Sequence, residues 1–158
     1  EYEGFEEETV KQADANLLTY PLELITDEGR IRQDMNYYEP RFDEDAPAMT
    51  HSILAVISAR LGDREQATAF FRQAYQPNQR APFGVLTETP FSENPYFATS
   101  AGGMLQAVLF GFGGLAFTDE GLVQRNPCLP SGWKRLTLKG VGPDRDTYTV
   151  QSLEVEAL

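Results

Sequence analysis

The feature that most constrains this chain is a change in the spacing of its apolar residues near Gly111. Before that point, apolar residues recur every three or four positions, which is the period of an amphipathic helix. After it, they largely alternate with polar residues, which is typical of strands. Helices followed by strands indicate two separate layers or domains. We therefore expect a helical part over residues 1–112 and a small β part over residues 113–158.

Glycine and proline divide the helical part into segments. The clearest helix ends at Gly62, and Asp63 is the predicted N-cap of the next one, so the two form a helical hairpin. Gly102 and Gly103 cost helix stability in a first turn, which favours a close approach of backbone or ligand there. Between the helices, residues 76–89 are expected to form a long loop, and such loops are often functional. Helices are expected over residues 9–20, 31–38, 53–61, 64–74 and 99–109, and strands near 115–123, 136–141 and 148–155.

Charge and composition exclude several classes of protein. The chain has 13 Lys and Arg residues against 24 Asp and Glu residues, a net charge of −11. This charge argues against binding to nucleic acid or to an anionic membrane surface. Cys128 is the single cysteine and His51 the single histidine, which excludes an intrachain disulfide and a Cys/His metal cluster. No apolar run approaches the length of a transmembrane helix, and we expect neither a metal nor a cofactor.

Candidate chemistry centres on carboxylates in the loop before the last predicted helix. Glu88 and Glu93 lie in a proline-rich stretch ahead of the small residues Thr99–Gly103, and either Thr99 or Ser100 is the predicted N-cap. A helix N-terminus presents free N–H groups to ligand oxygens, and a carboxylate beside it can hold or activate a water molecule. On the residues alone, a solvated loop carboxylate is the more frequent case.

Lys11 and Gln12 form a second candidate site. Both side chains can donate hydrogen bonds to sugar hydroxyls. Without further information, a solvated helix face is the more frequent arrangement for such a pair. From the residues alone, the sequence thus predicts an acidic, mainly helical domain with a polar site of the kind that binds carbohydrate.

Several strings in the chain resemble the C-terminal part of glycoside hydrolase family 65. The strings KQAD and YYEP begin at Lys11 and Tyr37, and longer ones cover residues 47–67, 87–115 and 126–142. Members of this family are larger enzymes that act on α-linked glucosides such as maltose, kojibiose or trehalose. The resemblance implies a mainly α fold, in which the last helices of an (α/α)6 barrel precede a few strands of a small C-terminal β domain.

The resemblance also implies roles for individual residues. Glu88 matches the place where family hydrolases carry the general base, and Glu93 fits that pattern less well. Lys11 and Gln12 match the pair that contacts the glucose held at the −1 subsite. A small carbohydrate is therefore the expected substrate.

The family includes phosphorylases as well as hydrolases, and both invert the anomeric configuration. Tyr96 and Phe97 fall where phosphorylases carry a histidine that helps to hold phosphate, which favours the hydrolase. Thr99 and Ser100 remain hydroxyl donors that can contact an anion or a sugar. A phosphorylase therefore stays open as an alternative, as does a non-catalytic helical module that binds a partner protein.

An inverting hydrolase needs two carboxyl groups, roughly 6.5–9.5 Å apart. In the family the general acid lies upstream of the Lys-Gln pair, and no segment here matches it. We therefore expect a C-terminal fragment of an inverting α-glucoside hydrolase that is inactive alone. Because an incomplete barrel leaves apolar helix faces uncovered, we expect self-association, or coverage by the missing N-terminal part of the barrel.

Overall fold

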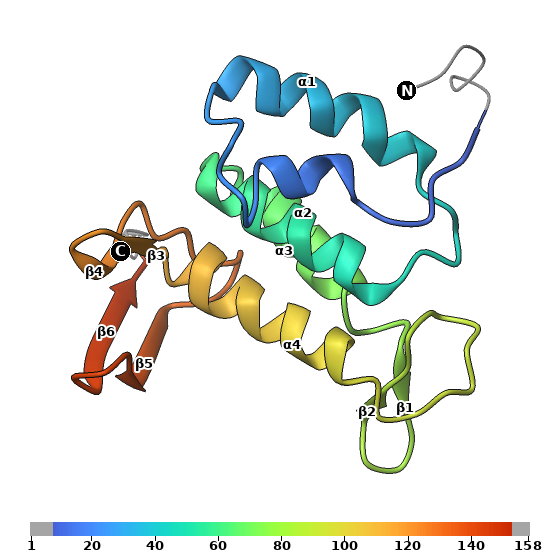
Figure 1. Ribbon diagram of the computed structural model, residues 1–158. Coiled ribbons are helices and arrows are strands. Elements are labelled where there is room, and N and C mark those ends of the chain that lie inside the picture. The colour runs from blue at the N-terminus through green and yellow to red at the C-terminus, as the bar shows by residue number, and fades with distance from the viewer. Residues whose placement is uncertain (1–7, 153–158) are drawn as a thin grey trace, which may run out of the picture.

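Helix α2 (Ala48–Arg60) lies at the centre of the fold, which a computed structural model describes for residues 8–152 (Figure 1). Buried residues occur all around this helix, as expected for one that neighbours cover on every side. It packs against α3 (Arg64–Gln73), α4 (Ala98–Gln106) and the π-helical segment η4 (Ala107–Phe112) that continues α4. The fold is mainly helical, and its core lies between α2 and these neighbours.

The predicted helical hairpin is confirmed. Gly62, at φ +78°, separates α2 from α3, and the Asp63 carboxylate accepts a hydrogen bond from the Gln66 N–H at 3.0 Å. Helix α1 (Glu28–Tyr38) includes the predicted helix over 31–38 and begins three residues earlier, after its own N-cap, Asp27. These elements follow local signals, which is why the sequence predicts them.

The helix predicted over residues 9–20 is wrong. Only Ala15–Leu18 is helical, as the short 3-10 segment η2. The Val10 N–H donates to the Arg41 carbonyl at 2.8 Å, and the Val10 carbonyl accepts from the Asp43 N–H at 3.0 Å. These long-range bonds occupy the backbone groups that a helix would need, so tertiary pairing overrides the helical spacing of the apolar residues.

Helix α4 starts earlier than the sequence indicates. Its N-cap is Phe97, so Thr99 and Ser100 lie inside the first turn, and their prediction as N-caps is wrong. The chain enters the helix from a hydrogen bond between the Phe97 N–H and the Leu86 carbonyl, at 2.8 Å. This bond fixes where α4 begins, in place of a side-chain cap.

The close approach predicted at the glycine pair is confirmed for one of its members. A Cβ added to Gly103 would lie 2.7 Å from the Ser52 hydroxyl oxygen, so glycine lets α4 pack directly on α2. At Gly102 an added Cβ would meet nothing within 4 Å. One glycine of the pair therefore serves helix packing.

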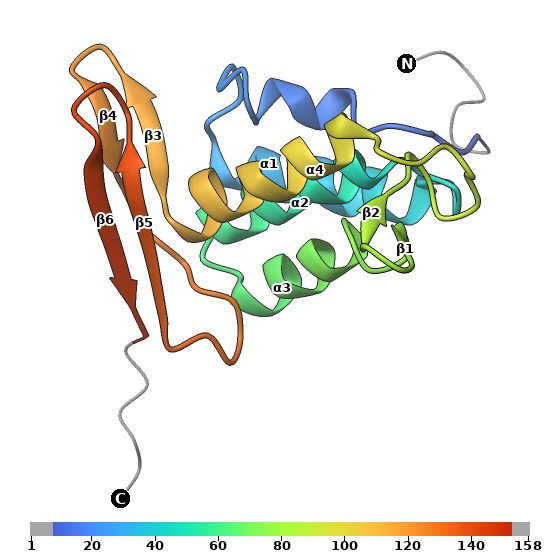
Figure 2. The same cartoon turned by 90° about the horizontal axis from the view of Figure 1, so that it is seen from below.

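Within residues 8–152 the strands form three antiparallel pairs (Figure 2). The β1–β2 pair lies where α4 begins, inside the segment predicted as a loop, and the other two lie where the helical part ends. The strands predicted after residue 112 are confirmed, except that Leu153 and Val155 fall outside the described residues. The pairs are β1 (Gln79–Arg80) with β2 (Val85–Leu86), β3 (Leu115–Thr118) with β4 (Gly121–Gln124), and β5 (Arg135–Val141) with β6 (Asp146–Gln151).

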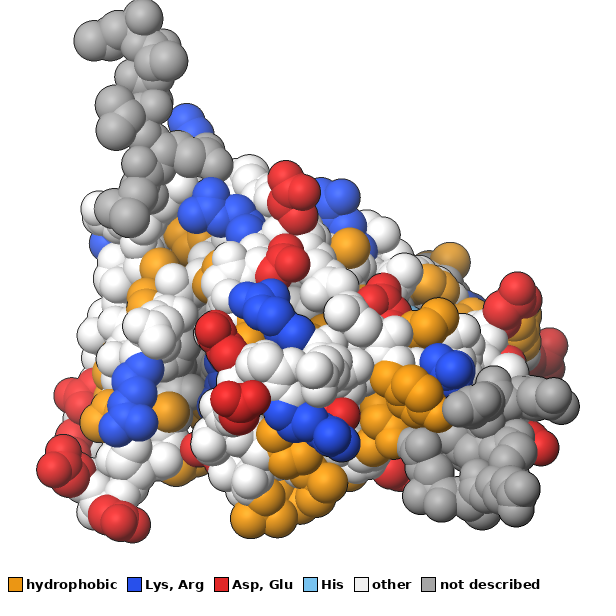
Figure 3. Space-filling model, turned by 90° about the horizontal axis from the view of Figure 1, so that it is seen from above, with side chains coloured by type: hydrophobic (Ala, Val, Ile, Leu, Met, Phe, Trp, Pro, Cys, Tyr) orange, Lys and Arg blue, Asp and Glu red, His pale blue; other side chains and the backbone are white. Residues whose placement is uncertain are grey.

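Large apolar side chains remain exposed on this chain. Figure 3 shows apolar patches among charged side chains on the face that carries α1. In the described part of the chain, no helix has the length and apolarity needed to cross a bilayer. The most exposed large apolar side chains of the helical part are Leu22, Leu24, Phe83, Phe91, Tyr96 and Leu105.

Tyr20 joins the N-terminal segment to α4 and gives a prediction for alkaline pH. Its buried hydroxyl donates to Gln106 Oε1 at 2.7 Å. Burial raises the pKa of Tyr20 to about 12, against a smaller opposing effect of the nearby Arg60 guanidinium. The unfolded chain releases this proton near pH 10. The contribution of the protonated Tyr20 hydroxyl to the free energy of unfolding is therefore complete below pH 10 and is lost between pH 10 and about 12.

We therefore expect Tyr20→Phe to remove part of this alkaline destabilisation. Denaturant unfolding of both proteins at steps from pH 9 to pH 12 measures it. The free energy of unfolding of the variant should fall less steeply above pH 10 than that of the wild type. Parallel curves would contradict the assignment of this alkaline loss to Tyr20.

Candidate functional site

Glu88 lies where two helices begin. Its main-chain carbonyl accepts a hydrogen bond at 3.1 Å from the N–H of Ala48, the first residue of α2. Two residues before Glu88, Leu86 pairs with the N-cap of α4. Helices α2 and α4 therefore start at the same end of the helical layer, beside β2 (Figures 1 and 2). Helix N-termini carry unpaired N–H groups and partial positive charge, so this end suits anions and polar oxygens.

A buried polar cluster holds the main chain at residues 87–88. Asn78 is 1% exposed, and its side-chain amide donates to the carbonyls of Thr87 and Glu88, each at 3.1 Å. Thr87, fully buried, directs its N–H and its hydroxyl to the Asn78 carbonyl at 3.0 and 3.1 Å. Ser100, also buried, donates to the Thr87 carbonyl at 2.9 Å. This segment is thus fixed from α2, from α4 and from the loop after α3.

Arg80 closes the same loop from the other side. Its guanidinium donates to main-chain carbonyls on both flanks of the Glu88 segment. Because one planar group binds four carbonyls, it holds the two arms of the loop together. The acceptors are the carbonyls of Pro77, Gln79, Pro90 and Ser92.

The Glu88 side chain itself is half-buried, and within residues 8–152 its carboxylate has no hydrogen bond or ion pair. The residue therefore combines a firmly held main chain with carboxylate oxygens that can accept a proton from a ligand or water. Glu93 is exposed, on the part of the loop that follows. Of the two predicted candidates, Glu88 is the one whose backbone is anchored.

Lys11 and Gln12 directly follow Val10, whose backbone pairs with Arg41 and Asp43 in the connection between α1 and α2. Both are exposed and line a cavity of about 510 Å³, together with Asn16 and Tyr38. Asn16 is 1% exposed, and its Oδ1 has no partner among the described residues. No hydrogen bond or ion pair within residues 8–152 joins the Lys-Gln pair to Glu88. The pair thus lies in a bend after Val10 and not in the helix expected there.

The two predicted hydroxyl donors of α4 differ in accessibility. Thr99 is exposed and lines a cavity of about 190 Å³ with Met49 and Gln106. The Ser100 hydroxyl is buried and directed at the Thr87 carbonyl. A contact with an anion or a sugar therefore remains a prediction for both residues, and Thr99 is the one at the surface.

Asn78, Thr87 and Arg80 were not identified as site residues from the sequence. Asn78 follows Pro77, a pair typical of a turn, and Arg80 reads as an ordinary surface cation. In the loop, these side chains donate hydrogen bonds to main-chain carbonyls, and every residue has such a carbonyl. The sequence therefore carried no side-chain pattern that marks them.

His51 and Cys128 show no arrangement for metal binding. The His51 ring packs near Phe70, with 6.4 Å between centroids, and burial lowers the pKa of His51. Burial raises the pKa of the Cys128 thiol, so this side chain stays protonated at neutral pH. Across residues 8–152, no three His, Cys, Asp or Glu side chains gather as metal ligands would.

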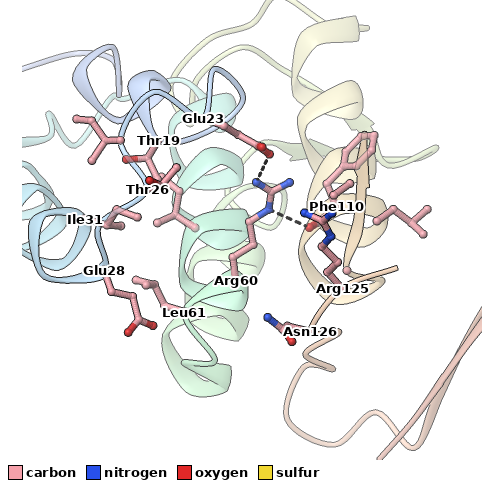
Figure 4. A pocket seen from close by; sticks show the side chains of 15 residues that line it. Thr19, Glu23, Thr26, Glu28, Ile31, Arg60, Leu61, Phe110, Arg125 and Asn126 are labelled. Atoms are coloured by element: carbon pink, nitrogen blue, oxygen red, sulfur yellow. Dashed lines mark hydrogen bonds and ion pairs between the residues drawn. The ribbon is translucent and has the colours of Figure 1, made fainter. Parts of the chain in front are cut away.

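A separate cavity of about 370 Å³ lies at the other end of α2 (Figure 4). Its central cation, Arg60, pairs with Glu23 at 2.7 Å and also donates to the Phe110 carbonyl. Helix α2 has 13 residues. At 1.5 Å per residue, its first and last residues are therefore about 18 Å apart along the axis. This cavity is thus distinct from the Glu88 site. The positive charge of its central residue, Arg60, is already neutralised by Glu23.

Comparison with known proteins gives matches along nearly the whole chain. Residues 2–82 match the family described as Glycosyl hydrolase family 65 central catalytic domain, a match that ends before Glu88. A kojibiose hydrolase of Mucilaginibacter mallensis is 47% identical over 152 residues, which is 96% of this chain and 22% of that protein. A kojibiose hydrolase of Flavobacterium johnsoniae is 45% identical, over 95% of this chain and 22% of that protein.

A more distant relative is the protein-glucosylgalactosylhydroxylysine glucosidase of Dictyostelium discoideum. It is 36% identical over 150 residues, which is 95% of this chain and 21% of that protein. The chain therefore spans about a fifth of the length of the curated relatives it matches.

Proposed function

This chain belongs to glycoside hydrolase family 65, and on that premise we propose that it is the C-terminal part of a larger enzyme that hydrolyses α-linked glucosides with inversion. Two relatives at 47% and 45% identity are kojibiose hydrolases, which makes kojibiose the first substrate to test. Lys11 and Gln12 would bind the glucose at the −1 subsite, and Glu88 would be the general base.

The proposed fold of the whole enzyme is an (α/α)6 barrel, of which residues 1–112 supply the last helices and residues 113–158 begin the β domain. Two observations support this proposal. Helices α2 and α4 start at the same end, as neighbouring helices of one barrel layer would. Exposed apolar side chains such as Leu24 and Leu105, 72% and 56% exposed, are available for further helices to cover.

The proposed reaction gives Glu88 the part of the general base. The Glu88 carboxylate takes a proton from water, and the water oxygen attacks the anomeric carbon on the face opposite the leaving group. The glycosidic bond breaks as the new bond forms, and a carboxylic acid from outside this chain protonates the leaving oxygen. The anchored main chain of Glu88 with its unpaired carboxylate is the observation that carries this proposal.

Product analysis of the full-length protein tests the function. It is incubated with kojibiose, nigerose, maltose and trehalose, with and without phosphate. We expect glucose as the product, released at the same rate in both conditions and first as the β-anomer by NMR. The 158-residue chain alone should show no turnover, because the general acid is absent.

Other products would point elsewhere. Glucose 1-phosphate formed only with phosphate would establish a phosphorylase and move attention to an anion site near Thr99. Robust turnover by the 158-residue chain would contradict the missing acid. No turnover of any disaccharide by the full-length protein would favour a binding module.

A further inference from the structure

We propose that Asn78 is a positioning residue for the reaction, and that its side-chain amide sets the place of Glu88 in the active site. This inference rests on the proposed role of Glu88 as general base. Asn78 does not need to touch the substrate, because it acts through the main chain of residues 87–88. Nothing in the family resemblance points to this residue.

The contacts of Asn78 explain why an amide is needed. Its Nδ2 donates to two consecutive carbonyls, those of Thr87 and Glu88, at 3.1 Å each. An NH₂ group supplies two donors from one atom, which suits two acceptors side by side. An aspartate at this position would place an oxygen against both carbonyl oxygens. The side chain is 1% exposed, so water does not compete for these bonds.

The anchor on the other side of Asn78 is the end of α3. The Asn78 N–H donates to the Tyr75 carbonyl at 3.1 Å, in the turn that follows that helix. The Asn78 carbonyl accepts both the N–H and the hydroxyl of Thr87. Asn78 therefore transmits the position of α3 to the backbone that carries the Glu88 carboxylate.

Loss of this amide should loosen the loop without unfolding it. The Thr87 carbonyl would keep its bond from the Ser100 hydroxyl at 2.9 Å, and the Glu88 carbonyl would keep its bond from the Ala48 N–H at 3.1 Å. Neither buried carbonyl is left without a donor, so the largest penalty for breaking a buried hydrogen bond does not arise. What changes is the orientation of the carboxylate, and a displacement of about 1 Å can cost roughly 100-fold in rate.

A double-mutant cycle in the full-length enzyme tests the proposal. Asn78→Ala is made in the wild type and in the Glu88→Gln background, and kcat and KM for kojibiose are measured. In the wild type we expect kcat to fall by roughly 10- to 100-fold with KM within about twofold. In the Glu88→Gln enzyme the same change should cost almost nothing, because the carboxylate to be positioned is gone.

Ser58→Ala is the matched control. Ser58 is also buried and donates to Gln66 Oε1 at 3.2 Å, but it lies toward the far end of α2. It should lower Tm and leave kcat unchanged in both backgrounds. Ser100→Ala, which removes one donor to the Thr87 carbonyl, replaces Asn78→Ala if that variant fails to fold, and should lower kcat by a few-fold only when Glu88 is present.

The outcomes separate the two proposals. An equal loss of kcat in the wild-type and Glu88→Gln backgrounds would overturn the positioning role, as would a wild-type kcat in the folded Asn78→Ala enzyme. If Glu88→Gln itself retains wild-type activity, the proposed base is wrong, and the failure lies with the proposed function.

Discussion

Glu88→Gln is expected to lower kcat of the full-length enzyme by roughly 10²- to 10⁴-fold, with little change in KM or Tm. The amide has the shape of the carboxylate but cannot accept the proton of the attacking water. Because the Glu88 carboxylate makes no hydrogen bond or ion pair within residues 8–152, its replacement breaks no contact described there. Steady-state kinetics with kojibiose and a thermal melt measure the two effects separately.

Glu93→Gln is the control for this experiment, because Glu93 lies on the same loop and is exposed. It should keep kcat within about twofold of the wild type. If Glu93→Gln loses activity and Glu88→Gln does not, the base is Glu93 and the assignment is reversed.

Azide provides a further test of the role. In Glu88→Ala, azide can attack the anomeric carbon without a base, forming a C–N bond as the glycosidic bond breaks. β-Glucosyl azide should therefore accumulate, and its configuration reports inversion. Restored glucose release without the azide adduct would argue against this role.

Phe112→Ala is expected to lower the free energy of unfolding by about 3–5 kcal/mol. Phe112 is fully buried where the helical part ends. Its ring meets Phe71 edge-on at 5.0 Å and lies 5.9 Å from Trp133, with distances taken between centroids. Removing it leaves a cavity between α3, the end of α4 and the segment that leads to β5. Urea unfolding of the chain at several protein concentrations measures the loss and any effect of association.

The same substitution five residues later is the control. Phe117 lies on β3 and is 74% exposed, so Phe117→Ala should change the free energy of unfolding by less than about 0.5 kcal/mol. Equal losses for both variants would mean that the Phe112 ring is not the centre of this junction.

The parts of the fold that the sequence predicts well have local causes. Asp63 caps α3 through the residue three positions later, and Gly62 ends α2 with a positive φ. The start of the chain has a distant cause instead. Val10 bonds to residues more than 30 positions away, and apolar spacing carries no record of such pairing. Phe97 as the start of α4 is set in the same way, by the Leu86 carbonyl.

In the candidate site, too, some residues could be predicted from the sequence and others could not. Glu88, Lys11 and Gln12 were assigned roles because their strings resemble a family. The structure bonds the Glu88 carbonyl to the first residue of α2, and Val10, next to Lys11, to the connection that leads to α2. Asn78 and Arg80 were not predicted as site residues, because their partners are main-chain carbonyl oxygens, which every residue possesses. A site built on side-chain identity can be read from a sequence, whereas one built on backbone acceptors appears only with the fold.

The hydrogen bonds around Glu88 also determine where this loop can change in length. Residues 86–89 are bonded on every side, so an inserted or deleted residue there would shift the proposed base, Glu88. A few positions later, Phe91 and Tyr96 are 72% and 75% exposed. Among the described residues, the backbone of residues 93–95 makes a local hydrogen bond, from the Asn94 N–H to the Ser92 hydroxyl. Changes of length between Ser92 and Tyr96 would leave the bonds that hold Glu88 in place. The proposed base can therefore keep its position while this outer segment changes in length.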